Sequence, residues 1–262
     1  MIVSKNIKAS SIYNYAKGRN INAVDERNVL ESLDKRRLVG FLKRIKRVSR
    51  NQPNAKGTRF WIKEGNTDFT CKLRRAKCCA LKKNGTPCSR RVVQGIFVCF
   101  QHVTKIFRIR IDQSGIVFNN KRMQGLFACD PTRSKNSILF RKGDEICPYF
   151  GEILTKTQLD NRYPGDVTAP YALRINNNKF IDSACFMSIG AKGNKPPTGR
   201  SAMANASLLE VTGNTDIGRI VAKKNIRNGS EIFLSYGRTY KFSNSGIKPS
   251  QRIVKKKRSC GR

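Results

Sequence analysis

Three cysteines and the only histidine of the chain have a spacing that suits metal binding. Cys78, Cys88, Cys99 and His102 follow the pattern C-x9-C-x10-C-x2-H. Three thiolates and one imidazole complete a closed tetrahedral shell, which structural zinc sites favour. Cys99 and His102 are close enough in sequence to bind one ion from a single turn. The pattern therefore predicts one structural zinc ion held by these four residues.

Other arrangements of the same residues are open. Cys79 can replace Cys78, Cys71 is a weaker candidate, and without metal the cysteines would be reduced and buried while His102 caps a turn. Residues 78–102 resemble a short zinc knuckle of the pattern C-x-A…K-x-G-x-x-C…C-x-x-H, and only Cys78 keeps its ten-residue step to Cys88. The nine cysteines are odd in number and follow no secretion signal. We therefore expect metal ligation and reduced thiols rather than a disulfide framework.

Five short segments follow one another between residues 124 and 237. They are Q-G-L-F-A at 124–128, R-K-G-D-E-I-C-P-Y-F-G-E at 141–152, F-I-D-S at 180–183, A-N-A at 204–206, and N-I-R-N-G-S-E-I-F-L-S-Y-G at 225–237. In this order and at this spacing they resemble the SET-domain family of protein-lysine methyltransferases. The resemblance implies a fold of several small sheets with a C-terminal pseudoknot. In such a fold an asparagine loop lies beside the final tyrosine.

The resemblance also implies an activity and a set of site residues. The activity is transfer of a methyl group from S-adenosylmethionine to lysine, an in-line displacement in which the protein mainly positions and desolvates the reactants. A narrow channel helps the lysine to lose its proton, and aromatic walls favour the cationic donor. The implied catalytic residues are Tyr236, with Tyr149 and Tyr171 completing the channel. The implied donor-binding residues are Gly125, Leu126, Phe127, Asn194, Lys195, Asn205, Ala206 and Tyr236.

The sequence departs from the family pattern at two places. Met123 stands where the family has its first glycine, and the N-H-S triplet is missing. Either residues 205–207 replace the triplet directly, or Asn194 takes the asparagine position and Asn205 belongs to a later P-N-A step. We prefer the second alignment, which places Lys195 where the family has histidine.

The rest of the chain supplies the elements that must position these residues. Residues 25–48 repeat apolar side chains at helical spacing, with acidic residues first and basic residues later, as the helix dipole favours. Short β-like runs follow, at 105–110, 137–140, 171–175, 179–182, 207–211, 219–222 and 231–234. We expect a mainly β fold with few helices, preceded by a helical basic region and a zinc knuckle. The expected divisions are a basic N-terminal region at 1–70, the knuckle at 71–105, the SET domain at 106–242 and a basic tail at 243–262.

Charge indicates the partners. The chain has 53 Lys and Arg against 17 Asp and Glu, a formal net charge of +36. Such a chain repels itself unless it meets a polyanion, so we expect contact with DNA or nucleosomes and a basic, chromatin-associated substrate such as a histone. The basic run at 255–258 suits a nuclear address, and nuclear localisation (the host nucleus for a viral protein) is the corresponding expectation. No run of 18 apolar residues predicts a membrane span.

Two alternative functions remain open. Met123 and the missing triplet favour a catalytically inactive SET-like module that binds chromatin or nucleic acid. A zinc-dependent nucleic-acid binder would instead keep its full DNA affinity in residues 1–105. Binding of labelled S-adenosylmethionine separates an enzyme from either module.

Overall fold

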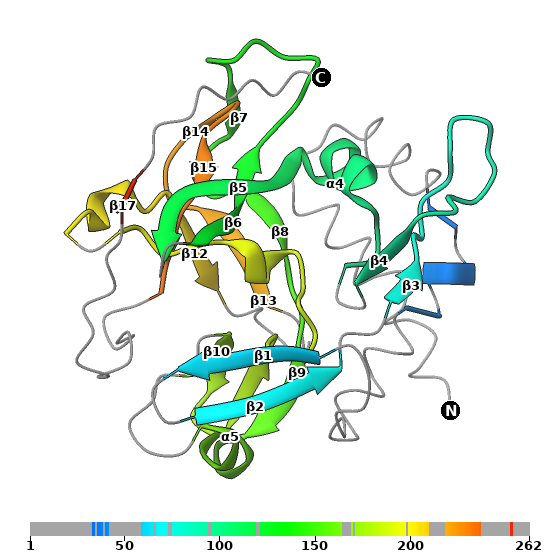
Figure 1. Ribbon diagram of the computed structural model, residues 1–262. Coiled ribbons are helices and arrows are strands. Elements are labelled where there is room, and N and C mark those ends of the chain that lie inside the picture. Colours follow the sequence, from blue (N-terminus) through cyan, green and yellow to red (C-terminus); the bar gives the residue numbers. More distant parts are fainter. Residues whose placement is uncertain are drawn as a thin grey trace.

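Small β-sheets carry most of the described chain (Figure 1). The structure is a computed structural model. It describes residues 33–34, 36–38, 40–41, 59–64, 67–72, 75–93, 96–118, 121–163, 169, 171–197, 199–209, 218–236 and 252–253.

Three sheets of three or four strands make up the main body of the molecule. The first has the strand order β15-β6-β5-β17, with β5 (Ile109–Phe118), β6 (Lys121–Ala128), β15 (Glu231–Ile232) and β17 (Arg252–Ile253). The second has the order β16-β12-β13-β8, with β8 (Glu145–Tyr149), β12 (Ala206–Leu209), β13 (Gly218–Ala222) and β16 (Leu234–Ser235). The third has the order β10-β11-β9, with β9 (Glu152–Thr155), β10 (Ala172–Asn176) and β11 (Lys179–Asp182).

Shorter elements surround these sheets. The two-stranded pairs are β1 (Arg59–Glu64) with β2 (Thr67–Lys72), β3 (Arg75–Lys77) with β4 (Arg91–Val93), and β7 (Ile138–Phe140) with β14 (Ile226–Arg227). Two helices are described from end to end, α4 (Phe100–Phe107) and α5 (Lys156–Arg162), together with the 3-10 turns η1 (Gly190–Lys192) and η2 (Ser201–Met203). Helix α5 starts with a capping box made by Thr155 and Gln158, which satisfies two backbone N–H groups.

One strand near the C-terminus threads between two earlier segments. Phe233 forms a parallel bridge to Asn194, and the following strand β16 pairs in parallel with β12. The N–H of Leu234 donates to the carbonyl of Asn194 at 2.8 Å on one side. On the other side, the N–H groups of Asn205 and Ala206 both donate to the carbonyl of Phe233. This threading is the predicted C-terminal pseudoknot, and it places the asparagine loop beside β16.

A continuous apolar core connects the cysteine-rich region to the sheets. Buried residues from 33–41, from the knuckle and from the central strands belong to one cluster. The ring of Phe41 lies 5.4 Å from that of Phe97 and 6.1 Å from that of Phe150, measured between centroids. The ring of Phe97 also packs edge-on against Phe107 at 5.6 Å. The knuckle is therefore fixed to the sheets by shared aromatic packing.

The predicted fold class is confirmed, since the described chain is mainly β with several small sheets and few helices. The strand predicted at 105–110 is wrong in part, because the residues up to Phe107 belong to α4 and β5 begins at Ile109. Val103, Ile106 and Phe107 are buried at helical spacing, and the helix stops at Arg108, whose left-handed φ of 52° turns the chain into β5. Of the helix expected at 25–48, residues 36–38 and 40–41 are helical and the others, except Asp34 and the bridge residue Leu33, lie outside the described residues.

The expectation of reduced thiols is wrong for two cysteines. Cys79 and Cys147 are buried and form no disulfide bond, as expected, but Cys129 and Cys185 are each disulfide-bonded. Odd cysteine number does not exclude disulfides when several other cysteines gather at a separate site. None of the helices in the described part of the chain has the length and hydropathy of a membrane span.

A buried charge network anchors α5 to the third sheet. The Nη1 atom of Arg162 donates to Asp182 Oδ2 at 2.7 Å and forms an ion pair with Glu152. The hydroxyl of Tyr163 donates to the same Asp182 oxygen. Burial raises the pKa of Glu152 to about 7, although the charge of Arg162 acts in the opposite direction. The network therefore contains a carboxyl that titrates near neutral pH in the folded protein.

This shift predicts a pH-dependent stability. In the unfolded chain Glu152 titrates near 4.5, so between that pH and about 7 the folded state binds more protons than the unfolded state. The stabilising difference is complete below 4.5 and is lost as the pH rises through about 7. We expect Glu152→Gln, which cannot titrate, to gain stability relative to the wild type as the pH rises across this window. Chemical denaturation at several pH values measures this, with the exposed Asp160→Asn as the matched control. Parallel curves for wild type and Glu152→Gln would exclude the mechanism.

Candidate functional site

The four predicted metal ligands come together. One donor atom each from Cys78, Cys88, Cys99 and His102 lies within 4.8 Å of all the others. The Nδ1 atom of His102 is 3.1 Å from the sulfur of Cys99 and 3.6 Å from that of Cys78. In a tetrahedral zinc shell with Zn–S bonds of about 2.3 Å, two sulfurs lie roughly 3.8 Å apart, so little contraction is needed. The donor set and its geometry fit a zinc ion, and Cys79 is not part of the cluster.

Local structure explains how these donors converge. Cys78 follows β3, Cys88 follows a hairpin loop, and Cys99 and His102 lie at the start of α4. The N–H groups of Ala80 and Cys99 point at the sulfur of Cys78, at 3.5 and 3.2 Å. Behind the cluster, the guanidinium of Arg37 donates to the carbonyls of Cys78 and Cys88. The N-terminal helical segment therefore holds two of the ligands in place.

The protonation preferences differ among the four ligands. Burial raises the pKa of the Cys78 thiol to about 12 in the absence of metal. At Cys88 burial also opposes ionisation, but hydrogen bonds from the Arg90 backbone and from neighbouring thiols outweigh it and lower the pKa. Burial, helped by the charges of Lys105 and Arg90, lowers the pKa of His102 and keeps the imidazole neutral. A bound dication would supply the charge that makes a cluster of thiolates favourable.

The second group of predicted residues lies around the threaded strand. The side-chain amide of Asn205 donates from Nδ2 to the carbonyl of Glu231 at 2.9 Å and accepts at Oδ1 from the N–H of Phe233 at 2.9 Å. One asparagine therefore satisfies backbone groups on both sides of Ile232. Ala206, which follows, is fully buried and pairs with Leu234 across the parallel ladder.

Asn194 and Gly125 lie together on the other side of the strand. The Nδ2 atom of Asn194 donates to the carbonyl of Gln124 at 2.9 Å and to Glu231 Oε1 at 3.3 Å. The same carboxylate oxygen accepts from the hydroxyl of Ser114 at 2.5 Å. A Cβ atom on Gly125 would collide with the Glu231 carboxylate and lie 3.1 Å from Asn194 Nδ2. Gly125 therefore lets its strand approach a polar group formed by Asn194, Glu231 and Ser114.

The three predicted tyrosines are connected through η1 and its flanks. The hydroxyl of Tyr236 donates to the carbonyl of Gly193 at 2.6 Å, and Tyr236 is half-buried against the core. Tyr149 is buried, its ring lies against Gly190, and its hydroxyl donates to the carbonyl of Tyr171 at 2.5 Å. Tyr149 and Tyr236 thus contact opposite ends of the same short turn.

The remaining predicted residues take supporting positions. Leu126 and Phe127 are buried on β6, where they pair with Ile232 and Glu231 of β15. Lys195 follows Asn194 and is half-buried. Met123, which stands where the SET-domain pattern has its first glycine, has 37% of its surface exposed, so its side chain is not enclosed in the candidate site.

Three site residues were not predicted. Gly193, Glu231 and Ser114 contact the predicted residues directly. Glu231 belongs to the closing segment quoted above, and Gly193 immediately precedes Asn194, so both carried a signal. Ser114 carried none, because 117 residues separate it from its partner Glu231.

Comparison with known proteins finds similarity only among solved structures. No protein-family model and no curated protein matches the sequence. The chain is similar to a candidate histone methyltransferase of Plasmodium falciparum, with 17% identity and a TM-score of 0.32, covering 48% of this chain and 96% of that one. It is also similar to the methyltransferase domain of human PR domain-containing protein 2, with 19% identity and a TM-score of 0.36, covering 52% of this chain and 83% of that one. Each match covers about half of this chain.

The cysteine and histidine cluster predicts a measurable metal content. We expect about one zinc ion per chain in protein purified without chelator, because the four donors complete a closed shell. Cys88→Ser should lose most of the zinc and lower the melting temperature, since metal binding and folding are coupled. Elemental analysis measures the content, and Cys147→Ser is the control that should keep it, because Cys147 is buried, forms no disulfide bond and lies outside the cluster. Metal-free wild type, or equal loss in both variants, would contradict the assignment.

Proposed function

We propose that the chain is an S-adenosylmethionine-dependent protein-lysine N-methyltransferase that acts on a basic chromatin protein such as a histone. The main support is the position of the Tyr236 hydroxyl, 2.6 Å from the Gly193 carbonyl. Glu231, at the start of the same segment 231–236, lies beside Gly125 and Asn194. This short segment therefore places a tyrosine hydroxyl beside Gly193 and a carboxylate beside Gly125.

The residues around Gly125 fit a cationic donor. When bound, S-adenosylmethionine would supply a methyl group on a positively charged sulfur. The lone pair of a neutral lysine amine would form the N–C bond as the S–C bond breaks, leaving a neutral thioether and a methylated ammonium. Asn194 offers an amide and Glu231 a half-buried carboxylate, and the carboxylate complements the donor's positive charge. The missing side chain at Gly125 lets the Glu231 carboxylate and the Asn194 amide pack directly against its backbone.

The tyrosines fit the task of positioning the lysine. A hydroxyl that donates its hydrogen to Gly193 presents its oxygen as an acceptor, so Tyr236 can orient an amine N–H. Tyr149 and Tyr171 would form aromatic walls, with the Tyr149 hydroxyl fixed by the Tyr171 carbonyl. A dry, aromatic surrounding favours the neutral amine over the ammonium, and only the neutral amine has the lone pair that attacks. Held orientation and desolvation supply much of the acceleration in such a displacement.

The proposed partners and location follow from charge. The excess of Lys and Arg favours a chromatin setting with DNA or nucleosome contact, and a nuclear location follows from this setting. The basic run at 255–258 lies outside the described residues. The proposed zinc ion is structural, because all four of its ligands would come from the protein.

The function is tested by removing one hydroxyl. We expect Tyr236→Phe to lower methyl transfer to histones by about a hundredfold or more, as for loss of a positioned polar group at the reacting centre. Its free energy of unfolding should change by only about 1 kcal/mol, the value of one hydrogen bond. Tyr163→Phe also removes one buried hydroxyl bond, to Asp182, and should keep activity. Mass spectrometry of histones incubated with the donor gives the rate.

Two results would count against the proposal. Equal activity of wild type and Tyr236→Phe would remove Tyr236 from the mechanism. Failure of the wild type to bind labelled S-adenosylmethionine would instead favour the inactive chromatin-binding module.

A further inference from the structure

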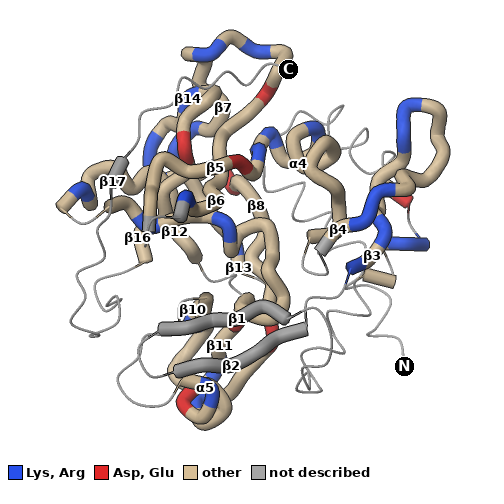
Figure 2. Tube along the Cα trace, viewed as in Figure 1, with Lys and Arg blue, Asp and Glu red and all other residues tan. Residues whose placement is uncertain are grey.

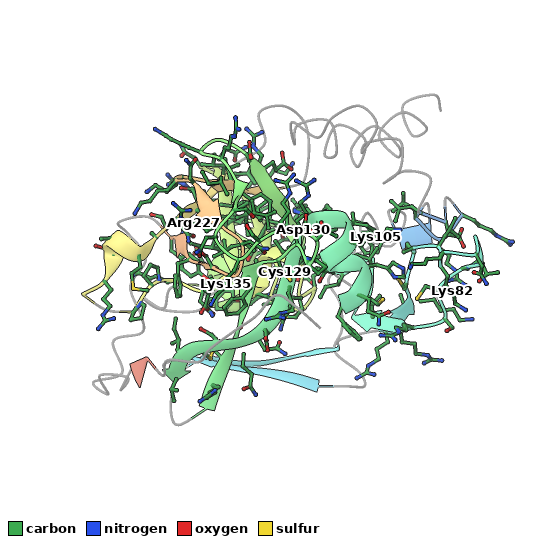
Figure 3. The ribbon with its side chains drawn as sticks, turned by 90° about the horizontal axis from the view of Figure 1, so that it is seen from above. Lys82, Lys105, Cys129, Asp130, Lys135 and Arg227 are labelled. Atoms are coloured by element: carbon green, nitrogen blue, oxygen red, sulfur yellow. The ribbon has the colours of Figure 1, made fainter. Side chains whose placement is uncertain are left out.

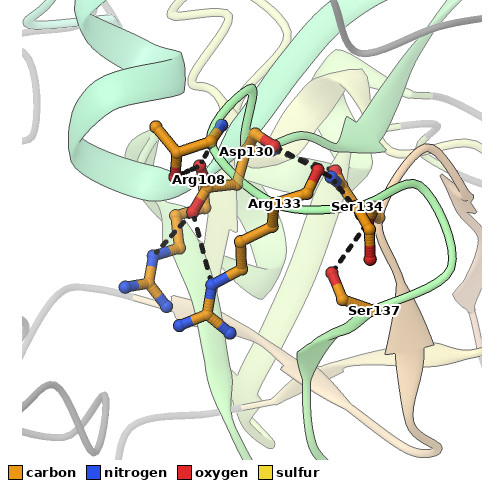
Figure 4. Close-up of polar contacts among 7 residues, drawn as sticks. Arg108, Asp130, Arg133, Ser134 and Ser137 are labelled. Carbon is orange, nitrogen blue, oxygen red and sulfur yellow. Dashed lines mark hydrogen bonds and ion pairs between the residues drawn. The ribbon is translucent and has the colours of Figure 1, made fainter.

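The loop between β6 and β7 is built around one buried side chain. Asn228, only 3% exposed, donates from Nδ2 to the carbonyls of Asp130, Arg133 and Ser134 and accepts at Oδ1 from the N–H of Asp130. A further bond from the Ser137 hydroxyl to the Ser134 carbonyl closes the turn (Figure 4). The backbone that carries Arg133 is therefore fixed, although the loop lies on the surface.

Asp130 holds two arginines side by side. Its Oδ2 atom lies 3.8 Å from the Nε atoms of both Arg108 and Arg133, while its Oδ1 atom accepts two hydrogen bonds from Thr132. Burial opposes its ionisation, but the bonds from Thr132 and the two guanidinium charges lower the pKa of Asp130, so the carboxylate is charged at neutral pH. Figure 4 shows the two guanidinium groups next to each other, with their terminal nitrogens turned away from Asp130. The two guanidinium groups and the one carboxylate together therefore carry a net positive charge.

The pair belongs to a larger basic edge, formed by residues 131–142 and 223–227 together with Arg108. The two segments contain seven Lys and Arg and no Asp or Glu. All seven are exposed, namely Arg133, Lys135, Arg141, Lys142, Lys223, Lys224 and Arg227. The segments are joined by the β7–β14 pairing, by the Lys142 N–H on Asn225 and by the Arg227 guanidinium on the Asn136 carbonyl.

Basic residues continue from this edge toward the knuckle. Figure 3 shows the molecule from above. The basic residues follow one another across it from Arg227 and Lys135 at the edge to Lys105 on α4 and Lys82 in the knuckle, with Asp130 between Lys135 and Lys105. In Figure 2 the loop that leaves β6, the end of α4 and the knuckle loop all carry Lys and Arg toward the upper side of the view. The basic face therefore extends over both the sheets and the knuckle.

We propose that the basic edge binds the phosphate backbone of duplex DNA, with Arg108 and Arg133 together holding one phosphate. Guanidinium groups match phosphate oxygens in bidentate geometry, and a pair already held by a carboxylate has less side-chain freedom to lose on binding. A row of exposed Lys and Arg gives further phosphate contacts along the backbone. The inference deepens the DNA contact in the proposed function by naming where it is made.

The test compares two double variants with equal loss of charge. Arg108→Gln/Arg133→Gln removes the pair, whereas Lys156→Gln/Arg174→Gln removes two exposed charges on α5 and β10, at the other end of the molecule (Figure 1). Fluorescence anisotropy with a labelled duplex, on the full chain without methyl donor, gives the affinity at several salt concentrations. We expect the Arg108/Arg133 variant to bind about tenfold or more weakly, with a salt slope reduced by about one to two. The control should stay within about twofold of the wild type.

Several outcomes would overturn the proposal. Equal losses in both variants would mean that only total charge matters, and unchanged binding in the Arg108/Arg133 variant would exclude the pair. Equally tight binding of a polyglutamate peptide through the same two arginines would point to an acidic protein surface instead. Tyr236→Phe should bind DNA like the wild type, so a wild-type chain that binds DNA through the pair but transfers no methyl group contradicts the enzyme proposal alone. If the wild type methylates free histone but the Arg108/Arg133 variant binds DNA with unchanged affinity, the DNA site alone is contradicted.

Discussion

The placement of one strand between two earlier segments governs the geometry of the whole candidate site. Residues 233–235 are inserted between Asn194 and β12, so their backbone groups must be satisfied on both sides. Asn205 does this with a single amide that bonds to Glu231 on one side and Phe233 on the other. A buried N–H or carbonyl without a partner costs about 1–3 kcal/mol, so the amide strongly specifies the register of the strand. That register fixes Glu231 beside Gly125 and Tyr236 beside Gly193.

A second constraint links the cysteine and histidine cluster to this arrangement. Helix α4 carries His102 in its first turn and leads through Arg108 directly into β5, the neighbour of β6. The aromatic rings of Phe41, Phe97 and Phe107 pack behind the cluster and reach Phe150, which follows β8. An ion at the cluster would therefore stabilise the packing that supports two of the central sheets, at a distance from the tyrosines.

Local sequence was most informative where spacing alone determines chemistry. The four candidate metal ligands could be named from the sequence because Cys99 and His102 share one turn and Cys88 is the only cysteine between them and Cys79. The strands at 138–140, 172–176, 179–182 and 218–222 were visible from β-branched and aromatic runs. The start of β5 was misplaced because Ile106 and Phe107 suit a strand as well as a helix, and burial from Cys99 onward decided for the helix. Disulfide bonds at Cys129 and Cys185, and the hydroxyl of Ser114 on Glu231, depend on contacts between distant segments, which no local pattern records.

The threaded strand also limits the order in which the chain can fold during synthesis. Synthesis proceeds from the N-terminus, so both walls of the gap, at Asn194 and at β12, leave the ribosome before the strand that fills it. Until residues 231–236 have emerged, the Gly193 carbonyl lacks the hydrogen bond from the Tyr236 hydroxyl. The Asn205 amide likewise lacks its backbone partners at Glu231 and Phe233. Such late, long-range pairing is entropically slow, and it comes after the knuckle and the β5–β6 hairpin can form locally. A nascent chain can therefore be compact, with its excess of Lys and Arg already in place, well before the candidate site around Tyr236 is assembled.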